Sequence, residues 1–162
     1  MLFRVRRECA RDGYIFGHGI SSDWHPFRLV GQMRPSMNRL VDDTKPIILV
    51  LDDDLLSLEL YSRELSSNYR VIACERVEDA RDCIKNNLLT AVILEPAVNG
   101  EDGWRFLIEI RSASTPLPVI VCSVLDERKI GLEQGADAFL VKPVLPTTLH
   151  HLLDQIVSRR TV

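Results

Sequence analysis

The 162-residue chain is 46% hydrophobic and 27% charged, a composition typical of a protein that folds around an apolar core. This composition excludes a disordered or fibrous chain, and the apolar runs are far shorter than the roughly 18 residues of a membrane helix, so we expect no membrane partner. The net charge of −3 is unevenly divided, because residues 1–44 carry seven basic and five acidic residues whereas residues 45–162 carry 13 basic and 18 acidic residues. The acidic main body does not favour direct contact with nucleic acid.

The first 44 residues show no sustained helical or strand period and mix arginine, glycine and proline with isolated aromatic residues. We expect residues 1–44 to be an irregular or disordered N-terminal extension and residues 45–162 to be the folded domain. Two interpretations of residues 1–32 stay open: a genuine arm, or a segment upstream of a start at Met33 or Met37. Because the extension lacks the apolar region of a secretory signal, we expect a cytoplasmic protein.

The four cysteines are widely spaced and form no Cys-x-x-Cys pair. Cys74 and Cys122 lie within apolar, strand-like runs, where cysteine behaves as a small hydrophobic residue. We therefore expect buried thiols in a reducing compartment rather than a zinc site or a disulfide framework.

The first two predicted elements of the domain are a strand and a helix. The continuous apolar run Ile47–Leu51 ends in three aspartates, a pattern typical of a strand buried on both faces. The segment 55–65 then places apolar residues at helical spacing, beginning with Leu55, and Asp54 is the predicted N-cap.

The same alternation continues toward the C-terminus. Further strands are predicted at residues 69–74, 90–94, 117–124 and 138–141. Further helices are predicted at residues 77–87, 103–111, 126–135 and 146–160. Strand–helix units repeated in this way predict an α/β fold, with a parallel sheet and helices on both of its faces. In such sheets, ligands bind outside the carboxyl ends of the strands.

Polar side chains leave the strands at this predicted edge. Asp52 and Asp53 follow the first strand, and Glu95 follows the third. Ser123 ends the fourth strand, and Lys142 follows the fifth. A carboxylate at the end of a buried strand is costly unless it has a partner, so Glu95 in particular needs an explanation. Three carboxylates at one edge offer the oxygen ligands that suit Mg²⁺, and the lysine would offset the remaining negative charge.

These motifs together resemble those of the receiver domain of two-component response regulators. The run "ILVLDDD" resembles the acidic pair of that family, and "GADAFLVKP" resembles its Lys-Pro signature after the fifth strand. Ser123 falls at the family's hydroxyl position, and Gly103 follows Glu95 by eight residues, as the family's glycine follows its phospho-acceptor aspartate. The resemblance covers residues 46–158 and implies a CheY-like, flavodoxin-like (βα)5 doubly wound fold with the sheet order 2-1-3-4-5.

The resemblance also implies roles for single residues. Asp52 and Asp53 would hold Mg²⁺, with Glu95 at the phospho-acceptor position as a third ligand. Mg²⁺ is a possible cofactor, with binding expected to be weak or absent.

Three further residues fall at positions that respond to phosphorylation in this family. Lys142 would contact the phosphoryl group, and Ser123 would hydrogen-bond it when the domain switches. Phe139 falls at the aromatic position whose rotamer follows the switch. The implied partners are a histidine kinase, a phosphotransfer protein or an output protein, with a homodimer through the last helices as a further expectation. We expect no enzymatic activity.

The chain departs from the family pattern at four places. Glu95 replaces the acceptor aspartate, Pro96 follows it directly, Asn99 replaces a usual loop proline, and the short interval from Ser123 to Lys142 implies a truncated fourth helix.

The extra methylene of Glu95 changes both reach and charge. It lengthens the side chain by one C–C bond, about 1.5 Å, toward the phosphoryl position. A displacement of about 1 Å can cost on the order of 10²-fold in rate, so Glu95 is a poor acceptor. It also brings a fixed negative charge nearer to Lys142 and Ser123, as a partial phosphate mimic. We therefore hypothesise a pseudo-receiver that is phosphorylation-independent or constitutively active-like. The alternative, an ion pair of Glu95 with Lys142 without signalling content, stays open.

A second function class is a Mg²⁺-dependent phosphohydrolase of the haloacid-dehalogenase type. The run "ILVLDDDL" offers an Asp-x-Asp after the first strand, and Ser123 and Lys142 would supply a hydroxyl and a cation. Against this alternative, Leu55 and Leu56 stand where that family has Gly-Thr or Gly-Val. Only Asp154 follows the lysine, where a late acidic pair is expected.

Overall fold

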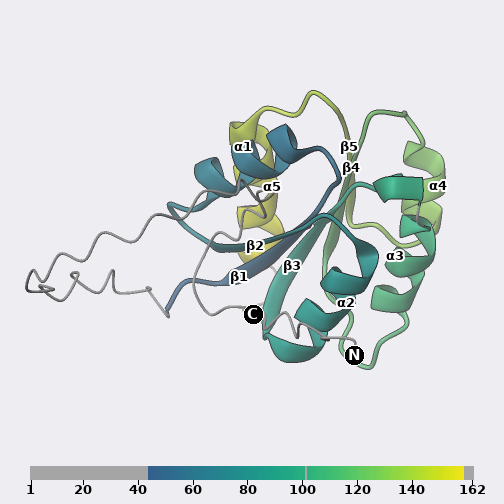
Figure 1. Ribbon diagram of the computed structural model, residues 1–162, viewed down its shortest axis with the longest axis horizontal. Coiled ribbons are helices and arrows are strands. Elements are labelled where there is room, and N and C mark those ends of the chain that lie inside the picture. Colours follow the sequence, from purple (N-terminus) through teal and green to yellow (C-terminus); the bar gives the residue numbers. More distant parts are fainter. Residues whose placement is uncertain (1–43, 101, 159–162) are drawn as a thin grey trace, which may run out of the picture. The chain divides into compact units, whose positions relative to one another are not determined.

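The computed structural model describes residues 44–100 and 102–158, without the side chain of Asn99, and these residues form a three-layered α/β domain (Figure 1). The strands are β1 (Ile47–Leu51), β2 (Arg70–Cys74), β3 (Leu89–Leu94), β4 (Val119–Ser123) and β5 (Ala138–Val141). The helices are α1 (Leu55–Leu65), α2 (Val77–Asn86), α3 (Gly103–Arg111), α4 (Arg128–Glu133) and α5 (Pro146–Ser158), with a 3-10 turn η1 at Val98–Gly100.

The predicted strands and helices are confirmed to within two residues at each described boundary. Helix α4 has six residues, which confirms the predicted truncation of the fourth helix. The expected extension over residues 1–44 lies, apart from Thr44, outside the described residues and stays a prediction. Among the described helices, none combines the length and the apolar character needed to cross a membrane.

All five strands run parallel, in the order β2-β1-β3-β4-β5. This order confirms the predicted flavodoxin-like sheet. The chain moves from β1 to β2 on one side and to β3 on the other, so the carboxyl ends of β1 and β3 flank the topological switch point. The residues from Ile48 to Leu51 are fully buried, as expected for a strand covered on both faces.

Helices α1 and α5 cover one face of the sheet, and α2 and α3 cover the other (Figure 1). On the first face, Val50 of β1 belongs to a cluster with Leu58 of α1 and Leu149 of α5. On the second face, Leu51 shares a cluster with Phe106 of α3. Alternate residues of one strand thus enter two separate cores.

Helix α1 begins directly behind the acidic end of β1. Asp54 is confirmed as its N-cap, because its carboxylate accepts hydrogen bonds from the backbone N–H groups of Leu56 at 3.2 Å and Ser57 at 3.3 Å. Leu55, with which the apolar spacing of this helix begins, is 53% exposed. It is the first residue of the helix, at the edge of the sheet, and the buried face begins one turn later at Leu58.

Candidate functional site

Buried polar side chains gather at the carboxyl edge of the sheet. Asp52 after β1 is 1% exposed, Glu95 after β3 is 4% exposed, and Ser123 at the end of β4 is 1% exposed. Lys142 follows β5, and its side chain is 11% exposed. The topology therefore brings four of the residues named from the sequence to one edge, three of them with ionisable groups.

The ammonium of Lys142 lies between two carboxylates. Its Nζ is 2.6 Å from Oδ2 of Asp52 and 3.2 Å from Oε2 of Glu95. We refer to these three side chains as the Lys142 cluster. Two negative charges and one positive charge leave the cluster with a single net negative charge when all three are ionised.

The second oxygen of each carboxylate accepts a backbone hydrogen bond. The N–H of Asp54 donates to Oδ1 of Asp52 at 3.0 Å, and the N–H of Ala97 donates to Oε1 of Glu95 at 3.2 Å. Each of the four carboxylate oxygens therefore has a donor or a cation beside it. Buried carboxylates are tolerated in such a setting because their charge is hydrogen-bonded and paired.

Burial and pairing act in opposite directions on the protonation of this cluster. Burial raises the pKa of Asp52 above its usual 3.8 by more than the hydrogen bonds from Lys142 and the Asp54 N–H lower it. Burial alone would lower the pKa of Lys142, but its hydrogen bond to Asp52 and the charges of both carboxylates raise it above 10.5. The lysine is therefore a fixed cation at neutral pH.

The three predicted Mg²⁺ ligands, Asp52, Asp53 and Glu95, lie in different environments. Asp53 is exposed, unlike Asp52 beside it. Among the residues that the structure describes, no group of three or more His, Cys, Asp or Glu side chains is placed to hold a metal ion. The ammonium of Lys142 lies between Asp52 and Glu95. Binding of Mg²⁺ by Asp52, Asp53 and Glu95 stays a prediction.

Ser123 shapes the loop that follows β4. Its hydroxyl accepts a hydrogen bond from the N–H of Leu125 at 3.3 Å, and its carbonyl accepts one from the N–H of Lys142 at 2.8 Å. The second bond connects the end of β4 to the lysine backbone. Ser123 thus lies at the predicted edge, with its hydroxyl engaged by its own loop.

Phe139 of β5 is enclosed by α4. The ring is 3% exposed, and a Cβ atom at Gly131 would lie only 2.8 Å from its Cδ2 atom. The guanidinium of Arg128 lies 5.7 Å from the ring centroid and donates to the Phe139 carbonyl at 3.1 Å. Sequence reasoning missed Gly131 and Arg128. A glycine inside the predicted helix 126–135 was the one available signal.

Gly103 fixes the loop that carries Glu95. A Cβ atom at this position would lie 2.5 Å from the carbonyl oxygen of Pro96, and the N–H of Gly103 donates to that oxygen at 3.2 Å. The start of α3 therefore packs directly on the residue after Glu95, and only glycine fits this approach.

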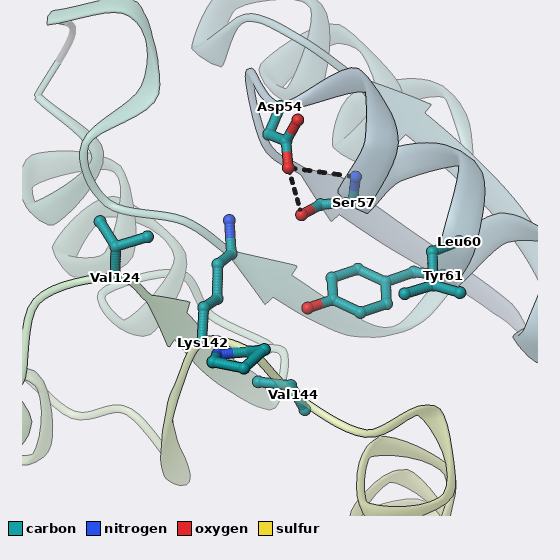
Figure 2. Close-up of a pocket in the computed structure, with 8 residues that line it drawn as sticks. Asp54, Ser57, Leu60, Tyr61, Val124, Lys142 and Val144 are labelled. Carbon is teal, nitrogen blue, oxygen red and sulfur yellow. Dashed lines mark hydrogen bonds between the residues drawn. The ribbon is translucent and has the colours of Figure 1, made fainter.

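A pocket of about 330 Å³ lies beside Lys142, between α1 and the segment after β5 (Figure 2). Figure 2 shows Asp54 and Ser57 hydrogen-bonded at the α1 end and the Tyr61 hydroxyl directed toward the Lys142–Val144 segment. Tyr61 is 2% exposed, and its burial raises its pKa. The lining residues are Asp54, Ser57, Leu60, Tyr61, Val124, Lys142, Pro143 and Val144.

Comparison with known proteins finds regulators of similar sequence and solved structures with a similar fold. The chain is 39% identical over 100 residues to the response regulator MprA of Mycobacterium sp. (strain KMS). The aligned region covers 59% of this chain and 44% of MprA. It is 31% identical over 118 residues to the transcriptional regulatory protein BasR of Escherichia coli (strain K12). That alignment covers 69% of this chain and 52% of BasR. The chain thus spans about half the length of these relatives.

Among solved structures, a CheY-like response regulator receiver domain protein from Methanospirillum hungatei JF-1 shares the fold, with a TM-score of 0.68 and 20% identity. That match covers 73% of this chain and 98% of the other. The comparisons do not support the haloacid-dehalogenase alternative. The family model of the response regulator receiver domain matches residues 48–154, and the chain belongs to this family of two-component signalling domains.

Proposed function

We propose that this receiver domain signals through protein–protein contacts without accepting a phosphoryl group, and that Glu95 stands in for the phosphorylated acceptor. The observation that carries the proposal is the position of Lys142, 2.6 Å from Asp52 and 3.2 Å from Glu95. A lysine held by two buried carboxylates already has the negative partner that a phosphoryl group would provide.

Glu95 is badly placed to act as a nucleophile. One of its oxygens faces Lys142, the other accepts from the Ala97 N–H, and the residue is 4% exposed. Phosphoryl transfer depends on a nucleophile that is open to in-line approach by the donor, and on cations free to bind the transferred oxygens. Both requirements conflict with the contacts of the Lys142 cluster.

The charge of Glu95 supports a role as a partial mimic. A carboxylate supplies one negative charge and two oxygens, against the nearly two charges and three oxygens of a phosphoryl group. In the receiver family, the aromatic side chain at the position of Phe139 changes its rotamer when the domain switches. Here Phe139 is 3% exposed, and its ring lies close to Gly131. This supports a domain held in one state by its own residues.

The proposed output is a contact with another protein. Receiver domains act with histidine kinases and output domains, and MprA and BasR are regulators of this kind by name. For this chain, we propose a histidine kinase, a phosphotransfer protein or an output protein as the partner, in the cytoplasm and without catalysis by the domain. A second copy bound through the last helices, α4 and α5, is the alternative partner.

Labelling by a small phosphodonor tests this proposal. The chain and its Glu95→Asp variant are incubated with acetyl phosphate and Mg²⁺, and intact masses are compared. We expect no added phosphoryl group on the chain and one on the variant, because the shorter side chain withdraws its carboxylate from Lys142. Stoichiometric, acid-stable and base-labile labelling of Glu95 would overturn the proposal. An unlabelled variant would contradict the argument from side-chain length.

A Glu95→Gln variant separates a signalling role from a purely structural ion pair. If Glu95 holds the switch, the aromatic NMR signals of Phe139 shift in this variant, because Lys142 loses one of its two partners. If the pair is structural only, stability changes while the Phe139 signals stay in place. The second result would leave the chain a receiver domain whose site carries no signal.

A further inference from the structure

Two cysteines that the receiver site does not use lie in contact between β2 and α2. The Sγ atoms of Cys74, the last residue of β2, and Cys83 of α2 are 3.7 Å apart. Both residues are buried, at 6% and 3% exposure. The sequence predicted buried thiols and no disulfide framework, because the cysteines are widely spaced and form no Cys-x-x-Cys pair.

The two elements that carry these thiols can approach each other more easily than the central strands can. A disulfide needs an S–S distance of about 2.05 Å, so the sulfur atoms must close by about 1.7 Å in total. Within the described sheet, β2 is an edge strand, and its one neighbour there is β1. An edge strand is a segment where local opening costs little.

We propose that Cys74 and Cys83 are an oxidation site, at which a peroxide converts the two thiols into a disulfide that fastens α2 to β2. In the first step, the Cys74 thiolate attacks a peroxide oxygen, the O–O bond breaks, and the leaving hydroxide takes up the thiol proton as water. In the second step, the Cys83 sulfur attacks the sulfenic sulfur, the S–O bond breaks, and a second water leaves. Two thiols are oxidised and one peroxide is reduced to two waters.

Cys122 provides a comparison within the same chain. It lies in β4, a strand flanked by β3 and β5, and is 1% exposed. Burial raises the pKa of its thiol to about 12, so almost none of the reactive thiolate exists at neutral pH. The proposed site therefore does not include Cys122.

Peptide mapping after peroxide treatment tests the site. The full chain is treated with hydrogen peroxide, remaining thiols are blocked with N-ethylmaleimide, and linked peptides are identified by mass spectrometry. We expect one linked pair, Cys74 with Cys83, which dithiothreitol reverses. The Cys122→Ser variant is the matched control and forms the same link. The Cys83→Ser variant forms none and accumulates a sulfenic acid on Cys74 that dimedone traps. Cys83→Ala replaces it if serine at this buried position prevents folding.

Two results would overturn the proposal. One is a native chain in which both thiols remain open to alkylation after treatment. The other is a mixture of disulfide pairings in the native chain that matches the mixture formed when the chain is oxidised while unfolded in urea. The oxidised chain should also unfold at a temperature higher by roughly 3–10 °C, since the cross-link constrains the unfolded chain. An unchanged unfolding temperature would contradict the fastening of α2 to β2. None of these results depends on the role of Glu95.

Discussion

The Lys142 cluster and the ion pair between Arg81 and Glu109 show how burial changes the meaning of similar contacts. The guanidinium of Arg81 in α2 donates two hydrogen bonds, of 2.9 and 3.1 Å, to the two carboxylate oxygens of Glu109 in α3. That geometry is more regular than the single-point contacts of Lys142. However, the side chains of Arg81 and Glu109 are 34% and 41% exposed, whereas that of Lys142 is 11% exposed.

The two sites differ in how the remaining charge is solvated when one partner of the ion pair is removed. A solvent-exposed charge is hydrated again by water, so an exposed pair contributes about 1 kcal/mol or less. A buried charge without its partner stays uncompensated, which costs about 3–5 kcal/mol. The Lys142 cluster should therefore respond strongly to mutation, and the Arg81–Glu109 pair weakly.

The largest effect is expected for Lys142→Met, which leaves the carboxylates of Asp52 and Glu95 facing each other without a cation. We expect the free energy of unfolding to fall by about 3–5 kcal/mol in urea denaturation near neutral pH. Lys129→Met, at an exposed lysine of α4, is the control and should change little. A loss below about 1 kcal/mol for Lys142→Met would mean that water solvates the cluster like an exposed pair.

The pH dependence of this loss is the next effect. Because the hydrogen bond and the charges of Asp52 and Glu95 outweigh burial, the pKa of Lys142 is raised above 10.5 in the folded chain. A raised pKa means that its contribution is fully present below pH 10.5 and is lost as pH rises through the folded value. The stability gap between the chain and Lys142→Met should persist at mildly alkaline pH and shrink only at higher pH. A gap that closes just above neutral pH would indicate a lowered pKa instead.

A smaller effect is expected for Glu95→Gln. The variant removes one of two negative charges that share one ammonium, while Asp52 keeps its bond to Lys142. We expect the free energy of unfolding to change by less than about 1.5 kcal/mol, the range of a single hydrogen bond. The same urea series measures it. A loss as large as that of Lys142→Met would show that Glu95, rather than Asp52, is the main partner of the lysine.

The smallest effect is expected for Arg81→Gln. The loss should be about 1 kcal/mol or less, and it should shrink further when salt is added, because exposed charges are screened. Glu109→Gln should give a similar or slightly larger loss, since it breaks the pair with Arg81 and also the 3.5 Å ion pair of Glu109 with Arg105. A salt-independent loss comparable to that of Lys142→Met would remove the distinction between the two sites.

The sheet and the position of the site could be predicted because buried parallel strands form continuous apolar runs that end at one edge. The polar residues at the ends of those runs were therefore expected at one edge. The strand order that makes them neighbours came from the resemblance to the receiver family. Asp53 could not be placed in the same way. It follows Asp52 directly, and neighbouring residues that leave a strand point in different directions, so one is buried and the other exposed.

Contacts that depend on packing between elements could not be predicted from the sequence. Spacing along the chain does not show that Lys142 approaches Asp52 more closely than Glu95, or that the Ala97 N–H bonds the acceptor carboxylate. The space that Gly131 leaves for Phe139 depends on how α4 lies against β5. The Arg81–Glu109 pair joins two helices separated by a strand, and nothing in their local patterns connects them.

The most direct test of a receiver held in one state by Glu95 is the response of Phe139 to beryllofluoride, a phosphoryl analogue, with Mg²⁺. The aromatic NMR signals of Phe139, assigned with a Phe139→Leu variant, are recorded during titration of the chain and of Glu95→Asp. We predict that these signals stay unchanged in the chain and shift in Glu95→Asp, whose shorter carboxylate leaves room for the analogue. A saturable shift of the Phe139 signals in the unmodified chain would contradict the account.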